Sequence, residues 1–337
     1  MRTGFNPNKD KPQQASDFWH QLVIPVYIPN QEDYFKDSFE IFKICLESVQ
    51  KTSHDRTFIT VVNNGSHEGV RTFLDQQLAA GKIHELIHSP NIGKLNAIVK
   101  GVNGHDFQLV TISDADVLFL DHWQQATYEL FNDFPKAGAV APLSFPSFLK
   151  YFTAPVWAKY WSSGRLKFQA VEDVKSLKDF AESINNPNFY KPAQLEKQLV
   201  LQSNGNTAGV GSGHFVNTYR GSIFEPPVGK HSGYQLGGGS ETKFVDAPVV
   251  AKGGYRLSTT KGYARHMGNT LAPWMQNQLG QLEQNQQSFE PLSLKPLKLS
   301  AFGRWRQKVL FKIISRGPLW KFILRRKGLS SAQANNY

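Results

Sequence analysis

The chain has 337 residues, of which 40% are hydrophobic and 12% aromatic. It can therefore bury a core and is not a disordered protein. Cys45 is the only cysteine, which excludes a disulfide framework and a zinc site built from several cysteines. Residues 291–337 hold 11 of the 38 Lys and Arg and no acid, so the other 38 − 11 = 27 basic residues balance the 27 acids of residues 1–290. A neutral body with a basic appendage argues against a nucleic-acid binder with positive charge spread over its fold.

The N-terminal residues 1–20 predict a flexible leader. Met1 to Asp17 is polar and lacks the apolar core of a signal peptide. No apolar run reaches the ~18 residues that a membrane-spanning helix needs. We therefore expect a cytoplasmic protein in a reducing compartment.

From residue 21 onward, apolar strands alternate with helices. Strands are predicted at 22–28, 58–62, 83–87, 109–112 and 138–142, and helices at 34–51, 67–80, 91–102 and 121–133. This alternation predicts an α/β, Rossmann-like fold with a mostly parallel sheet flanked by helices. Ligands of such sheets bind at the carboxyl ends of the strands, where three polar turns fall at 63–66, 90–94 and 113–116.

The second half of the chain has a less regular pattern. Residues 145–205 carry aromatic side chains among polar ones and predict an insertion or lid on the acceptor side. Residues 207–269 are dense in glycine, and residues 270–297, rich in Gln and Pro, predict a linker.

Residues 298–337 predict a basic amphipathic helical tail. Phe302, Trp305, Val309 and Ile313 share one helical arc, and Gly317-Pro318 should break the helix. Apolar and basic side chains without acids suit an anionic membrane surface, through residues 298–328. The alternative is a helix that packs on the body or on a protein partner.

Asp114 and Asp116 directly follow the predicted strand 109–112. Alternate residues of an extended segment share a face, so both carboxylates can point at one place. Such a pair suits a hard divalent cation whose other ligands are phosphate oxygens. The alternative interpretation is an acidic turn that caps the next helix.

Four short motifs follow one another at the ends of the predicted strands. They are Ile24-Pro25-Val26-Tyr27, Val61-Val62-Asn63-Asn64-Gly65-Ser66, Asn91-Ile92-Gly93-Lys94-Leu95-Asn96-Ala97 and Ser113-Asp114-Ala115-Asp116. In this order they resemble the GT-A fold glycosyltransferases of the family 2 type. The resemblance covers roughly residues 21–269, and implies a nucleotide-binding half at 21–145 and an acceptor or catalytic half at 146–269.

The resemblance implies a nucleotide-sugar site. Pro25 and Tyr27 match the strand end against which the base packs, and Asn63 matches the acid that usually reads the base. An amide both donates and accepts, so the base identity stays open, with a UDP-sugar expected. Lys94 could approach the nucleotide or be an ordinary lysine at a helix start. The implied donor-binding residues are Pro25, Tyr27, Asn63, Asn91, Gly93, Lys94, Asp114 and His214.

Glu241 lies in Gly237-Gly238-Gly239-Ser240-Glu241-Thr242, which resembles the family's Gly-Glu-Asp turn. The resemblance makes Glu241 the general base for the acceptor hydroxyl, with Asp246 as the alternative. Thr242 replaces the second acid of the family turn. Without a catalytic role, Glu241 would be a helix N-terminal acid favoured by the helix dipole.

His266 closes the resemblance, where relatives often carry a metal-binding histidine. It is implied as the third ligand beside Asp114 and Asp116, and a nitrogen ligand suits Mn²⁺ better than Mg²⁺. A structural histidine is the alternative. His214 lies in a glycine-lined turn and could contact donor sugar or acceptor, or be a histidine at the edge of the core.

The resemblance implies a metal-dependent hexosyltransferase. It would move a sugar from a nucleotide-diphospho-sugar to a glycan or lipid-linked acceptor with inversion, in bacterial envelope polysaccharide or glycolipid synthesis, at the inner face of the membrane. Two alternatives stay open. A sugar nucleotidyltransferase is disfavoured because residues 28–34 contain no glycine and no basic residue. A non-catalytic membrane scaffold of the same fold is supported by the departures at Asn63 and Thr242.

Overall fold

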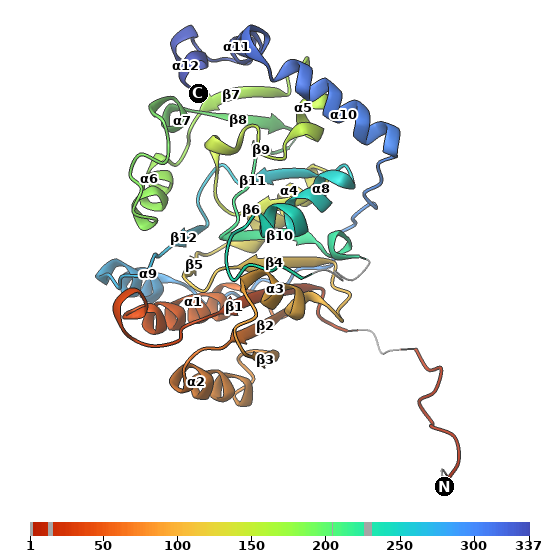
Figure 1. The fold of residues 1–337 in the computed structure, drawn as a ribbon, viewed down its shortest axis with the longest axis vertical. Coiled ribbons are helices and arrows are strands. Elements are labelled where there is room, and N and C mark those ends of the chain that lie inside the picture. The colour runs from red at the N-terminus through yellow and green to blue at the C-terminus, as the bar shows by residue number, and fades with distance from the viewer. Residues whose placement is uncertain (1–2, 13–15, 204, 226–230) are drawn as a thin grey trace.

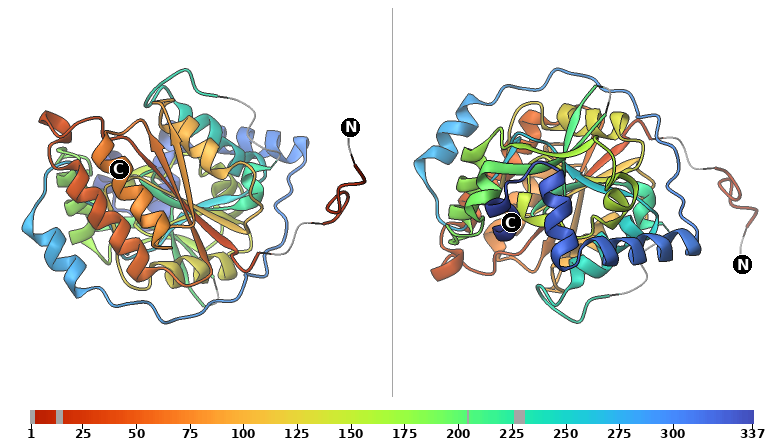
Figure 2. Two further views of the ribbon diagram at one scale, coloured as in Figure 1. Left: turned by 90° about the horizontal axis from the view of Figure 1, so that it is seen from below. Right: turned by 90° about the horizontal axis from the view of Figure 1, so that it is seen from above.

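A computed structural model describes residues 3–12, 16–203, 205–225 and 231–337 (Figure 1). A ten-stranded sheet runs through the molecule in the order β3-β2-β1-β4-β10-β6-β11-β9-β8-β7. Helices cover both faces of the sheet, as the two views of Figure 2 show. The predicted α/β class is thereby confirmed.

Four neighbouring strands with apolar central residues pair in parallel. They are β1 (His20–Val26), β2 (Thr57–Asn64), β3 (Glu85–Ser89) and β4 (Leu109–Ser113). β1 pairs in parallel with β2, with Ile24 opposite Val61, and with β4 on its other edge. Alternate residues of β1 face opposite layers. Leu22 and Ile24 pack with the α1 core, whereas Val23 packs with α3.

The helices of this half run close to their predicted ranges. They are α1 (Ser38–Thr52), α2 (Glu68–Ala79), α3 (Lys94–Val102) and α4 (Trp123–Asp133). The predicted helix 34–51 begins later, because Asp33–Phe35 forms a separate short turn. A small two-stranded sheet pairs β5 (Val117–Phe119) with β12 (Ala264–His266). Because His266 lies opposite Val117, this sheet places His266 next to the Asp114–Asp116 turn.

The rest of the sheet comes from the second half of the chain. β10 (Val216–Arg220) lies antiparallel between β4 and β6 (Ala137–Ala141), and β11 (Tyr255–Ser258) continues parallel to β6. β9 (Thr207–Val210), β8 (Lys197–Gln202) and β7 (Leu166–Ala170) add antiparallel pairs at the edge. The predicted lid at 145–205 therefore includes sheet strands, together with α5 (Ala154–Tyr160), α6 (Val174–Ser183) and α7 (Pro192–Glu196).

The segment predicted as a linker, 270–297, lies against the body. It begins with α9 (Pro273–Gln281), and the Asn285 amide then donates to the Lys51 carbonyl at 2.7 Å. Further on, the Gln108 side chain pairs with both backbone groups of Leu292, at 2.5 and 2.7 Å. The polar composition predicted a linker. In the structure, the Gln108 side chain hydrogen-bonds the Leu292 backbone in place of water, and the segment packs along the body as a strap.

Three helices end the chain: α10 (Ala301–Ile314), α11 (Gly317–Arg326) and α12 (Ser331–Asn336). The predicted break at Gly317-Pro318 separates α10 from α11. Trp320 of α11 packs on Trp157 of α5 with ring centroids 4.7 Å apart, so these helices extend a hydrophobic core of the body.

At the N-terminus, Trp19 and His20 are buried, so the last residues of the predicted leader already belong to the folded body. Within the described residues, no helix combines the length and the apolarity that crossing a bilayer requires.

Candidate active site

A cavity of about 430 Å³ opens at the carboxyl ends of β1, β2 and β4. This is the edge where ligands of parallel α/β sheets bind, and the volume is in the range of small-molecule sites. Most of the predicted donor-binding residues line it. Its lining includes Pro25, Tyr27, Tyr34, Asn64, Asn91, Lys94, Asp114, Asp116, Gln235, Leu236 and Asn269.

Lys94 is the central charge of the cavity. It is the first residue of α3, and its ammonium lies 2.6 Å from Asp114 Oδ1 and 3.2 Å from Glu241 Oε1. Burial alone lowers the pKa of Lys94, but the two carboxylates together raise it above its ordinary value. Lys94 therefore stays protonated and joins the turn after β4 to the predicted base.

Gly93 allows Lys94 to take this position. Its φ of 87° is in the left-handed region, and a side chain there would meet the Tyr234 carbonyl at 2.7 Å. The Lys94 backbone amide also donates to the Gln235 carbonyl at 2.8 Å. The segment 231–241 thus crosses the start of α3 and brings Glu241 to Lys94, a contact that local sequence patterns do not reveal. Neither Gly93 nor Glu241 is among the described residues that line the cavity.

Asp116 has a different partner from Asp114. Its Oδ2 lies 3.4 Å from His266 Nε2, and His266 Nδ1 lies 3.0 Å from the Ser183 hydroxyl. Burial raises the pKa of Asp116, and the nearby His266 opposes that rise. Asp116 Oδ1 is buried and has no hydrogen-bond partner among the described residues. It is available to a cation or another ligand.

The predicted metal ligands do not form one cluster. Within the part of the chain that the structure describes, no three His, Cys, Asp or Glu side chains converge as a metal site. Asp114 is paired with Lys94 instead of joining Asp116 and His266. The Asp114 and Asp116 carboxylates line the same cavity, but in this structure each has a different charged partner. The oxygen and nitrogen donors of Asp116 and His266 still fit a divalent ion that completes its coordination with phosphate oxygens.

Asn63 and Asn64 are both buried at the end of β2, but they lie differently with respect to the cavity. Asn63 is buried; its amide pairs with His88 Nδ1 at 3.0 Å, and its Oδ1 accepts from the Ser66 amide at 3.0 Å. Among the described residues, the cavity lining includes Asn64 but not Asn63. Neighbouring residues of a strand point to opposite sides, and two adjacent asparagines do not show which side is which.

Asp246, the alternative base, is locked in a buried ion pair. Both Asp246 and Arg256 are completely buried, with 2.9 Å between Oδ1 and the guanidinium. Burial raises the pKa of Asp246, and Arg256 opposes that rise. Asp246 Oδ2 also lies 3.4 Å from His214 Nε2. An acceptor hydroxyl cannot reach this carboxylate, whereas Glu241 is partly exposed beside the cavity.

His214 and Thr242 belong to this second cluster. His214 contacts Asp246 and the Tyr151 ring, and burial lowers its pKa. It is not among the described residues that line the cavity, so its predicted contact with the donor sugar is not visible. The Thr242 hydroxyl lies 2.5 Å from the Tyr151 hydroxyl. At the position where the resemblance implied a second acid, this chain has a threonine hydroxyl hydrogen-bonded to the Tyr151 hydroxyl.

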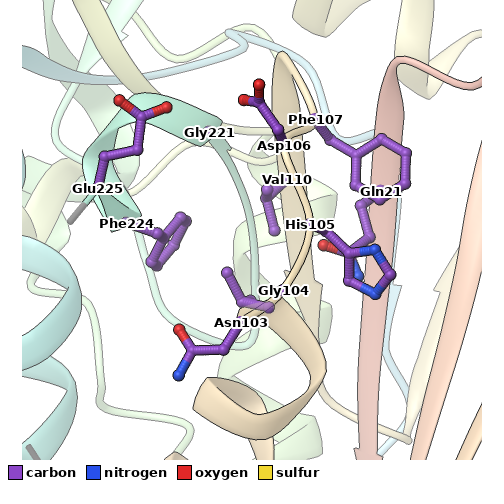
Figure 3. A pocket seen from close by; sticks show the side chains of 11 residues that line it. Gln21, Asn103, Gly104, His105, Asp106, Phe107, Val110, Gly221, Phe224 and Glu225 are labelled. Carbon is purple, nitrogen blue, oxygen red and sulfur yellow. The ribbon is translucent and has the colours of Figure 1, made fainter. Parts of the chain in front are cut away.

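Figure 3 shows a different cavity, between the loop at 103–107 and the segment 221–225. Gln21, Phe107 and Phe224 are among its lining residues, so it lies toward the start of β1 and away from the Asp114–Asp116 turn. Its volume of about 60 Å³ is too small for a nucleotide or a sugar. The cavity beside Lys94 is therefore the better candidate.

A cavity at the carboxyl ends of parallel strands, lined by a lysine, carboxylates and amides, is typical of the ligand sites of α/β proteins. Residues 25–180 match the family described as glycosyl transferase family 2. The match covers 180 − 25 + 1 = 156 of the 337 residues, and it supports the predicted resemblance to the family 2 glycosyltransferases. No curated protein sequence matches the chain.

The chain is similar to several solved structures at low sequence identity. S. aureus TarS 1–349 is 10% identical with a TM-score of 0.43, over 73% of this chain and 59% of that one. Mannosyltransferase PcManGT from Pyrobaculum calidifontis, in complex with GDP-Man and Mn²⁺, is 14% identical with a TM-score of 0.40, over 96% and 75%. GalNAc-T7 with UDP, GalNAc and Mn²⁺ is 11% identical with a TM-score of 0.45, over 76% and 46%. The chain thus spans less than two thirds of the TarS and GalNAc-T7 chains.

Proposed function

We propose that the protein transfers a sugar from a nucleotide-diphospho-sugar to an acceptor hydroxyl, with inversion at the anomeric carbon. The observation that carries this proposal is Lys94, held between Asp114 and Glu241 at the mouth of the donor cavity. A fixed cation beside a partly exposed carboxylate supplies the two functions that the transfer needs. One is positive charge for the leaving diphosphate, and the other is a base for the acceptor.

The cavity suits a nucleotide. The Tyr27 ring is partly exposed next to Pro25 and meets Phe35 edge to face, with centroids 5.9 Å apart, so it offers a flat apolar surface for a base. The amides of Asn64 and Asn91 add hydrogen-bonding groups. We propose UDP as the nucleotide of the donor, since an amide can pair with uracil.

Asp116 and His266 are the residues that would hold a divalent metal, Mn²⁺ or Mg²⁺. The unpartnered Asp116 Oδ1 and the neighbouring imidazole nitrogen support this role. When bound, such an ion neutralises charge on the diphosphate. Lys94 would add a second positive charge from the protein itself.

Glu241 would act as the general base. As the acceptor oxygen bonds to the anomeric carbon, the bond from that carbon to the diphosphate oxygen breaks, and the acceptor proton passes to the Glu241 carboxylate. In the free protein, Glu241 is paired with Lys94. Donor phosphates would compete for the Lys94 ammonium, so donor binding would release the base for its acceptor.

We propose a glycan or lipid-linked acceptor, as in the synthesis of bacterial envelope polysaccharide or glycolipid. The basic segment 291–337, which carries no acid, supports an acceptor held near an anionic surface. The domain limits that we propose are a leader at 1–20, a catalytic domain at 21–269, a strap at 270–297 and a basic tail at 298–337.

Calorimetric binding of UDP and GDP, each with and without Mn²⁺, tests this function. We expect UDP to bind in a metal-dependent manner and the Asp116→Ala variant to lose the metal dependence. Preference for GDP would keep the proposed glycosyltransferase activity but would make the donor a GDP-sugar instead of a UDP-sugar. Failure of both nucleotides to bind the folded protein would contradict the proposed function and favour a scaffold role.

A further inference from the structure

Helix α10 has two apolar faces, and the body covers one of them. Ile314 is buried, and Leu310 and Phe311 pack against the core that also holds Trp157 and Trp320. The opposite face carries Phe302, Trp305, Val309 and Ile313, with exposed fractions from 37% for Val309 to 68% for Phe302. Docking onto the body therefore does not explain this second row of large apolar side chains.

The exposed row continues onto α11. There, Trp320, Ile323 and Leu324 face the core, whereas Leu319 and Phe322 are exposed. On α10, the rings of Phe302 and Trp305 stack with centroids 5.7 Å apart. We call these six exposed side chains, Phe302, Trp305, Val309, Ile313, Leu319 and Phe322, together with the exposed basic residues of 301–326, the α10–α11 surface.

The charges of this surface are all positive. Its eight basic residues are exposed, and residues 291–337 contain no Asp or Glu. On α10, Arg306 and Lys312 fall on either side of the apolar row by helical spacing. The basic residues are Arg304, Arg306, Lys308, Lys312, Arg316, Lys321, Arg325 and Arg326.

The surface lies at one end of the molecule. In Figure 1, α10 and α11 are at the top, at the opposite end from α2 and β3. In the right-hand view of Figure 2, both helices lie toward the viewer, on the outside of the fold. A flat partner could therefore approach this end.

We propose that the α10–α11 surface docks on an anionic lipid bilayer. Aromatic and aliphatic side chains of an interfacial helix enter the boundary between headgroups and acyl chains, while Lys and Arg remain at the anionic headgroups. This arrangement accounts for the exposed apolar row and the uniform positive charge together. The proposal goes beyond sugar transfer and includes no residue of the donor cavity.

Other partners fit this surface less well. A second copy of the chain, meeting through the same surface, would set two groups of eight cations against each other. A nucleic acid would neutralise the charges but would leave six large apolar side chains without an apolar environment. A lipid bilayer offers both an anionic surface and an apolar interior.

Co-sedimentation of the full-length chain with vesicles tests the proposal. We expect binding to vesicles of phosphatidylcholine mixed with phosphatidylglycerol, and weaker binding to phosphatidylcholine alone. High salt should reduce the first, since it screens the headgroup charge. Replacing both Phe302→Ser and Trp305→Ser, or both Lys308→Glu and Lys312→Glu, should weaken binding to the mixed vesicles at least about tenfold.

Matched controls lie on α2 and just after it, at the far end of the molecule. Leu78 is 40% exposed there, so Leu78→Ser removes an exposed apolar side chain, and Arg71→Glu with Lys82→Glu inverts two exposed charges. These variants should bind vesicles as the native chain does. All variants should keep the native melting temperature and nucleotide affinity, which separates this test from that of the proposed function.

Four results would overturn the proposal. One is that the native chain ignores the mixed vesicles, and another is that the α10–α11 variants bind them as tightly as the α2 controls do. The third concerns the oligomeric state, measured by light scattering without lipid. If the native chain is a dimer and Phe302→Ser with Trp305→Ser makes it a monomer, the surface is an interface between copies. Salt-sensitive binding to DNA, lost in the same variants without vesicle binding, would likewise assign it to nucleic acid.

Discussion

Two ion-pair clusters lie close together in this protein, and they differ in their access to solvent. Lys94, Asp114 and Glu241 meet beside the cavity at the carboxyl ends of the strands, each with about a quarter of its side chain exposed. Asp246 and Arg256 meet in the interior with no exposure. A charge that a substrate must reach needs such an opening, whereas a sealed pair can only hold the structure. The difference in exposure therefore indicates that the Lys94 cluster can contact a ligand, whereas the Asp246–Arg256 pair can only stabilise the fold.

The largest expected effect concerns the base. Glu241→Gln should lower the turnover of a nucleotide-sugar donor by about 10²–10⁴-fold, because an amide cannot accept the acceptor proton. Lys243→Gln, on the same turn and exposed, is the matched control and should retain activity. Steady-state kinetics on the two purified variants checks this. Full activity of Glu241→Gln would remove the catalytic distinction between the clusters.

The buried cluster should dominate stability. Arg256→Leu leaves the Asp246 carboxylate buried without its partner, and we expect the free energy of unfolding to fall by about 3–5 kcal/mol. Lys94→Leu breaks partly exposed pairs and should cost about 1 kcal/mol or less. Urea denaturation of both variants measures the difference. Equal losses would show that exposure does not separate the two clusters.

Stability should also fall in acid, because two buried histidines, His20 and His54, resist protonation in the folded state. Burial lowers the pKa of His54 to about 4, from 6.5 in the unfolded chain, and it lowers that of His20 well below 6.5. The unfolded state therefore takes up protons first, and stability decreases as the pH drops from about 6.5 to 4. His54 alone should contribute about 2–3 kcal/mol to this loss. Urea titrations at several pH values check it, and His54→Gln should flatten the profile; an unchanged profile would contradict the assignment.

The smallest effect should distinguish the two asparagines after β2. Asn64→Ala should weaken UDP binding by about tenfold, since it removes one polar contact of the cavity. It also removes the bond from Asn64 Oδ1 to the Ile92 amide, 2.9 Å long, so the melting temperature serves as a control. Asn63→Ala should affect stability more than UDP affinity. Calorimetry on both variants decides, and the reverse order would restore the role first predicted for Asn63.

Much of the nucleotide-binding half was predictable because its signals are local. Apolar runs of strand length, ended by asparagine, glycine and aspartate, marked β1, β2 and β4, and their carboxyl ends formed the expected edge. The same signals placed Lys94 and Asp114 at adjacent turns. The second half was harder to predict, because β7, β8 and β9 are short antiparallel strands with different burial patterns. β7 alternates buried and more exposed residues, whereas β8 and β9 are buried along most of their length.

The sequence by itself determined the α/β class and the group of turns that carries the polar residues, since these depend on short-range periodicity and turn chemistry. Tertiary structure decided which of these residues meet. β10 inserts between β4 and β6 from about a hundred residues further along the chain, and the segment 231–241 brings Glu241 to Lys94. The tertiary structure also paired Asp114 with Lys94 and Asp116 with His266, and it placed Asn64 in the lining of the cavity. Such long-range pairings depend on sheet order and strand register, which no local pattern encodes.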